Sequence, residues 1–99
     1  MKTIKVRKLK GLWEQSRGLI GRKDVNSVYF ETRWGVHTFF LQDTITVIIL
    51  DKEQTIQSIK VVQPNSLYIW NPLYSKIVEL RGDKATLYEV GEKVNIVEQ

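Results

Sequence analysis

Apolar and polar residues alternate with a period of two along much of this chain, and that pattern constrains its fold more than any other feature. Residues 4–7 read Ile-Lys-Val-Arg, which is typical of a strand with one side facing solvent. Residues 46–50 are β-branched and almost wholly apolar, so we expect a central strand that is covered on both faces. The pattern therefore predicts a mainly β protein.

Turn residues divide the remaining strand-like segments. Residues 51–54 are a polar turn that should join the central strand to the next one as a hairpin. The segment 84–89 is interpreted as either a short helical turn or another strand. Further strands are predicted at 27–33, 36–42, 55–63, 66–70, 76–81 and 94–97. Many short strands favour a small barrel-like or strongly curved sheet, antiparallel or mixed.

One short helix interrupts this scheme near residues 11–20. Leu12, Ser16 and Leu19 share a helical face there, and Gly21 suits the position just beyond a helix end. With 99 residues, the chain fits a single domain spanning 1–99.

Composition excludes several classes of protein. The chain has no cysteine, which rules out disulfides, thiolate metal sites and a cysteine nucleophile. The longest apolar run, residues 47–50, is far too short to span a membrane. No apolar signal core follows the basic start. We therefore expect a soluble, cytoplasmic domain, and no motif indicates a cofactor or a metal site.

Positive charge is concentrated at the start of the chain. Residues 1–23 hold eight basic side chains and one acid, whereas the whole chain has a net charge of +4. Such asymmetry indicates either an anionic partner, such as nucleic acid, or a solvated edge strand that lysines protect from aggregation. We favour the edge strand because the basic residues form no recognised nucleic-acid motif.

Several motifs in order along the chain resemble one family. The first motif, residues 13–22, reads Trp-Glu-Gln-Ser-Arg-Gly-Leu-Ile-Gly-Arg, and the second, residues 35–41, reads Gly-Val-His-Thr-Phe-Phe-Leu. A third is the apolar strand that ends in Leu-Asp at 50–51. The last two are Val-Glu-Leu followed by a glycine, within residues 78–82, and Val-Gly-Glu-Lys-Val at residues 90–94. Together these motifs resemble the DUF192 (UPF0127) family of uncharacterised small β-rich proteins. The resemblance covers nearly the whole chain and implies a compact β-rich domain with little helix, but no activity.

The chain departs from that family at one position. Many relatives carry an aspartate shortly after the second motif, and Thr46 occupies that place here. The resemblance implies that any activity requiring the acid is absent from this protein.

Two residues near the second motif are candidates for acid–base chemistry. His37 is the only histidine, and an imidazole suits a general base because it titrates near neutrality. Asp43 follows the same predicted strand and would orient the imidazole, or it serves as a turn residue. No Ser-His-Asp pattern is evident, so a structural histidine hydrogen-bonded in the core is the alternative.

Glu79 is the third acid–base candidate. It lies in the predicted strand 76–81 and points to the same face as Arg81. A carboxylate there either faces water or needs a cationic partner, and Arg17 and Arg22 are candidates. The group would form a stabilising ion pair or a charged pocket for a small polar ligand.

Aromatic residues near predicted turns raise a further alternative. An exposed ring could stack on a base, whereas in a short β domain aromatic rings usually fill the core. The residues are Trp13, Trp34, Tyr68, Trp70 and Tyr74. The apolar segment 66–74, which includes three of them, is an interface patch, a lid or a longer strand.

Two classes of function follow from these residues. We favour a non-catalytic domain for a small ligand or a protein partner, because no nucleophile stands out. Its candidate ligand-binding residues are Arg17, Arg22, His37, Glu79 and Arg81. The alternative is a small hydrolase-like enzyme that uses His37 with Asp43 or Glu79. Nucleic-acid binding through the basic N-terminal third is a weaker alternative.

Overall fold

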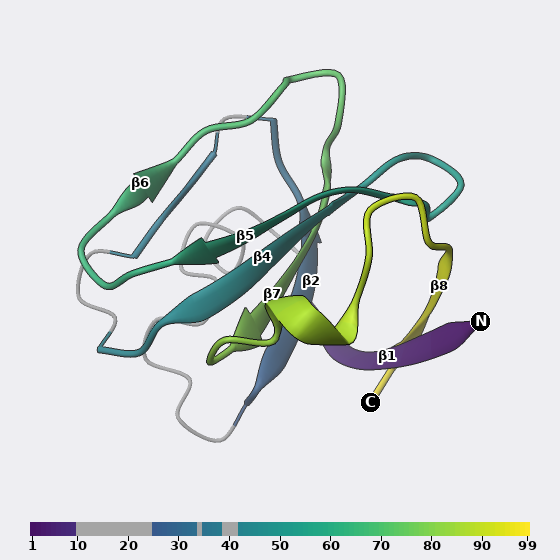
Figure 1. The fold of residues 1–99 in the computed structure, drawn as a ribbon, viewed down its shortest axis with the longest axis horizontal. Coiled ribbons are helices and arrows are strands. Elements are labelled where there is room, and N and C mark those ends of the chain that lie inside the picture. Colours follow the sequence, from purple (N-terminus) through teal and green to yellow (C-terminus); the bar gives the residue numbers. More distant parts are fainter. Residues whose placement is uncertain (10–24, 34, 39–41) are drawn as a thin grey trace.

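The main feature of the fold is one mixed sheet of six strands, in the order β5-β4-β7-β2-β1-β8 (Figure 1). The computed structural model describes residues 1–9, 25–33, 35–38 and 42–99. The strands are β1 (Lys2–Lys8), β2 (Ser27–Glu31), β3 (Val36–His37), β4 (Ile45–Leu50), β5 (Ile56–Val62), β6 (Leu67–Tyr68), β7 (Lys76–Arg81) and β8 (Val94–Glu98). The prediction of a mainly β protein is confirmed, and the helix expected near residues 11–20 lies outside the described residues.

The N-terminal strand lies inside the sheet. β1 pairs in parallel with β2 on one side and with β8 on the other, whereas the β2–β7, β7–β4 and β4–β5 pairs are antiparallel. The interpretation of the basic N-terminal segment as an edge strand is therefore wrong, since β5 and β8 are the edges of this sheet. All three lysines of β1 are exposed: Lys5 lies between the buried Ile4 and Val6, and Lys2 and Lys8 lie at the two ends of the strand.

The sheet is curved but does not close into a barrel within the described residues. At one end the two edges meet: Ile56 N donates to Glu92 O at 2.9 Å, and Val94 N donates to Gln54 O at 3.1 Å. Beyond this contact, among the strands that the structure describes, β5 pairs only with β4 and β8 pairs only with β1. The barrel-like alternative is corrected to an open sheet whose two edges touch at one end.

The central strand β4 is covered on both faces, as its apolar sequence predicts. All six of its residues are buried. Val47 and Ile49 belong to one apolar cluster with Phe30 and Ile77, whereas Ile48 packs in a second cluster on the other face. Two separate apolar clusters therefore cover the two faces of one sheet.

The predicted hairpin after β4 is present. Asp51 accepts hydrogen bonds from the amides of Glu53 and Thr55 and from the side chain of Gln57, and Gln54 takes a positive φ of 63°. These contacts form the turn without a glycine. Of the two alternatives for residues 84–89, the helical one holds: Ala85–Leu87 is a 3-10 helix, labelled η1.

The β3 and β6 strands form a small second sheet. Each has two residues, so the predicted strands 36–42 and 66–70 are shorter in the described residues than expected. Trp70 is 9% exposed and donates from its indole to Tyr74 O at 2.8 Å, so this ring fills the core and does not form a stacking surface. Trp13 and Trp34 lie outside the described residues.

Candidate functional site

A concave pocket of about 610 Å³ lies where β7 ends and η1 begins. We call it the β7–η1 pocket. Its walls come from the first half of β1, the start of β2, the segment before β4, the end of β7 and η1 with the residue after it. The lining residues are Thr3, Ile4, Lys5, Asn26, Ser27, Asp43, Thr44, Leu80, Arg81, Gly82, Lys84, Leu87 and Tyr88. Pockets of a few hundred Å³ are typical of small-molecule sites.

Two residues predicted from the sequence meet in this pocket. Arg81, at the end of β7, donates from Nη1 to the carboxylate of Asp43 in a close ion pair. Its Nη2 donates to Val25 O at 3.0 Å, so the guanidinium is held at two points. The Arg81 side chain is 20% exposed and that of Asp43 is 51% exposed, which leaves the carboxylate as the more solvated partner. Asp43 is thus placed to orient an arginine.

The turn after β7 forms the floor beside this ion pair. Gly82 has a φ of 86°, a conformation that favours glycine, and its amide donates to Thr44 O at 2.7 Å. The hydroxyl of Thr46 donates to Gly82 O and accepts from the amide of Lys84, both at 2.8 Å. The buried Thr46 therefore fixes the turn to the central strand.

The pocket has one apolar wall. Leu80 and Ile4 are buried core residues, whereas Leu87 of η1 is 53% exposed at the mouth. Tyr88 completes this wall. The pKa of its phenol is raised, because the effect of burial is larger than the opposing effect of the Lys2 ammonium, which lies 5.3 Å from the ring centre. Tyr88 therefore presents a neutral, partly desolvated ring to the pocket.

Glu79 does not line this pocket. It is 3% exposed and pairs across the sheet with Val28 and Val47. Ile77 packs in one apolar cluster and Leu80 in the other, as the predicted alternation of side chains along β7 requires. Glu79 therefore lies on the same face of the sheet as Ile77, opposite to Leu80. Its proposed partners Arg17 and Arg22 lie outside the described residues, so the ion-pair hypothesis stays a prediction.

His37 lies in the small second sheet. Its backbone pairs with that of Leu67 in β6, and its side chain is not among the parts of the chain that the structure describes. The described lining of the β7–η1 pocket includes Asp43 but not Glu79. Within the described part of the chain, no three His, Asp or Glu side chains are grouped to hold a metal ion. No helix there is long and apolar enough to cross a membrane.

Several pocket residues were missed in the sequence. Asn26, Ser27, Lys84 and Tyr88 are isolated polar or aromatic residues in segments 50 or more positions apart along the chain, and no motif connects them. One local signal in the sequence is the Gly82-Asp83 pair, a glycine next to an aspartate directly after the predicted strand 76–81, which is typical of a turn.

Comparisons with known protein families, with curated proteins and with solved structures found no match. The resemblance to the DUF192 family therefore stays a hypothesis, and the class of the protein is defined by its fold: a small, open, mixed β-sheet domain with a pocket at one end of the sheet.

Proposed function

We propose that this protein is a non-catalytic binding domain that holds a small organic ligand in the β7–η1 pocket. The observation that supports the proposal is the combination of a volume of about 610 Å³ with an apolar wall and a few fixed polar groups. Ligand sites in proteins have this composition, since apolar contacts supply affinity and placed polar groups supply orientation.

The polar groups of the pocket favour binding over hydrolysis. The Ser27 hydroxyl donates to Lys5 O, and the Thr44 hydroxyl donates to the side chain of Gln63 at 3.0 Å. Neither hydroxyl is hydrogen-bonded to a base in the described lining, whereas an activated nucleophile requires one. Asp43, the one acid among the described lining residues, is paired with Arg81.

A thermal-shift screen against neutral, anionic and cationic metabolites tests this function, because a ligand of the native state raises the melting temperature. The variant is Leu87→Glu, which places a charge on the apolar wall. The control is Val90→Glu, since Val90 is 63% exposed and lies outside the lining. We expect a shift that is lost in Leu87→Glu and kept in Val90→Glu. A shift kept in both, or hydrolysis of nitrophenyl esters that Asp43→Asn abolishes, would contradict the proposal.

A protein-interaction role is the second candidate, and it rests on a different part of the molecule. Leu67, Ile69 and Leu73 are 62%, 64% and 76% exposed on the segment 66–74. Exposed apolar side chains in one segment favour contact with another protein surface, including a second copy of the chain. Sedimentation velocity across a wide concentration range tests self-association: Leu73→Ser should weaken a dimer, and a monomer at all concentrations would contradict it.

A further inference from the structure

We propose that the ligand of the β7–η1 pocket is a small amphipathic anion. A carboxylate or phosphate group would lie beside Lys84, and an apolar body would lie against Leu80, Leu87 and Tyr88. This inference rests on the proposed function, because it names the class of ligand for the same site.

The charges of the lining are unbalanced. Among the residues that the structure describes, three cations, Lys5, Arg81 and Lys84, line the pocket together with one acid, Asp43. Asp43 forms an ion pair with Arg81. Within the described residues, Lys5 and Lys84 make no ion pair, so the described lining carries an excess of two positive charges. A concave site lined by one sign of charge concentrates ligands of the opposite sign.

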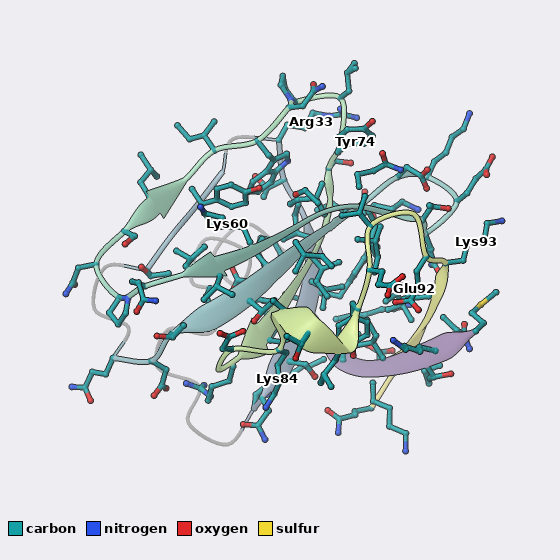
Figure 2. All side chains as sticks on the ribbon, viewed as in Figure 1. Arg33, Lys60, Tyr74, Lys84, Glu92 and Lys93 are labelled. Carbon is teal, nitrogen blue, oxygen red and sulfur yellow. The ribbon has the colours of Figure 1, made fainter. Side chains whose placement is uncertain are left out.

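The position of Lys84 places one of these charges at the pocket floor. A side-chain carbon built on Gly82 would lie 3.8 Å from Lys84 Nζ, so the ammonium lies against a glycine of the lining. Figure 2 shows Lys84 beside η1, on the same side of the molecule as the turn after β7. The backbone of Lys84 is fixed by the hydrogen bond from its amide to Thr46, which limits how far the ammonium can move away.

Lys5 contributes from the far side of the pocket. It lies on β1, which is separated from β7 by β2. Strands two apart in a sheet lie roughly 10 Å from each other. One anionic group would therefore contact Lys84 directly, while Lys5 raises the positive potential across the whole pocket.

The apolar wall makes a bare inorganic anion a poor fit. Leu80, Leu87 and Tyr88 line the same pocket as Lys84, and an ion such as inorganic phosphate would leave these side chains without a partner. Burial of apolar surface is the main source of affinity for small ligands in such sites. The fitting ligand therefore carries one anionic end and one apolar end.

A matched series of six-carbon probes tests the charge requirement: hexanoate, hexyl phosphate, hexan-1-ol and hexylammonium, titrated into the full chain and followed by NMR chemical shifts. We expect hexanoate or hexyl phosphate to bind about tenfold more tightly than hexan-1-ol at low salt, with the advantage reduced at high salt. The stronger of the two anions identifies the head group. Inorganic phosphate should bind more weakly than hexyl phosphate.

Charge variants locate the anionic end. Lys84→Glu should weaken binding of the preferred anion by about tenfold, since it replaces an attraction by a repulsion. Lys60→Glu is the control, because Lys60 is also exposed and changes the net charge equally but lies on β5 outside the lining. Asp43→Asn should tighten anion binding about threefold, because it removes the one acid of the described lining. Unchanged melting temperatures would show that the variants are folded.

The outcomes separate the two proposals. Equal binding of hexan-1-ol and the anions, or equal effects of Lys84→Glu and Lys60→Glu, would overturn the anion requirement and leave a binding pocket standing. Loss of the shift for every compound of the wider screen would overturn the binding pocket itself.

Discussion

The hydroxyl of Thr46 donates a hydrogen bond to the carbonyl oxygen of Gly82 across 2.8 Å, in a position without exposed surface. The hydroxyl oxygen of Thr46 in turn accepts a hydrogen bond from the amide of Lys84. A hydroxyl can donate and accept at once, whereas an ionised carboxylate only accepts. The resemblance to the DUF192 family implies an acid at this position, and the threonine found here suits a role in holding the turn.

Replacing Thr46 by valine should destabilise the protein by about 2–4 kcal/mol, because Gly82 O and Lys84 N would both lose a buried partner. Valine has nearly the same shape as threonine, so the change in the free energy of unfolding reports the loss of the hydroxyl group alone. Urea unfolding at constant m-value measures the change in the free energy of unfolding. Thr46→Ser keeps both hydrogen bonds and should cost about 1 kcal/mol for the lost methyl group. Equal losses in the two variants would show that the hydroxyl does not hold the turn.

Glycine conformation gives a second prediction. Gly35 has a φ of 108°, and a side-chain carbon there would lie 2.7 Å from Tyr68 O, a backbone atom. Gly91 has a φ of 92°, but nothing lies within 4 Å of such a carbon. Gly91→Ala should therefore cost only backbone strain, of order 1–3 kcal/mol, and Gly35→Ala should cost clearly more. Thermal unfolding of both variants makes the comparison, and equal losses would contradict the close approach of Gly35 to β6.

Local strand structure was largely predictable from the sequence, because period-two patterning is set by which side chains face the core. The pairing order was not. The inward position of β1 depends on contacts with β8, such as Ile4 beside Ile96, from the opposite end of the chain. No local pattern distinguishes an edge strand rich in lysine from an internal strand with one wet face.

The candidate site was predictable only in part. Asp43 and Arg81 are charged residues at element ends, and reasoning from sequence selected both. Their pairing, and the lining by Lys84 and Tyr88, follow from the meeting of separated segments at one end of the sheet. Such convergence is a property of the tertiary structure.

The hairpin turn gives a prediction for acid. Hydrogen bonds from the amides of Thr55 and Glu53 and from Gln57 lower the pKa of Asp51 below its usual 3.8, against a smaller opposing effect of desolvation. A lowered pKa in the folded state contributes stability above pH 3.8 that is lost as the pH falls through the folded value. Asp51→Asn should therefore show a shallower loss of stability in this acid range than the wild type. Acid titrations of unfolding free energy compare them, and parallel curves would exclude the effect.

Tyr29 gives the corresponding prediction for alkali. Partial burial, with smaller effects from the charge of Glu31 and its hydrogen bond to the phenol, raises the pKa of Tyr29 from 10.0 to about 12. The folded state therefore keeps a proton that the unfolded state loses above pH 10, and stability falls as the pH rises from 10 toward 12. NMR of ring-labelled tyrosine measures the titration, with Tyr29→Phe assigning the signal. Glu31→Gln should lower the pKa of Tyr29 but leave it above 10, because burial is the largest cause. Glu89→Gln is the control, because Glu89 is exposed and the substitution changes the net charge equally. If the pKa of Tyr29 fell to 10 in Glu31→Gln but not in Glu89→Gln, the carboxylate of Glu31 and not burial would be the main cause of the raised pKa.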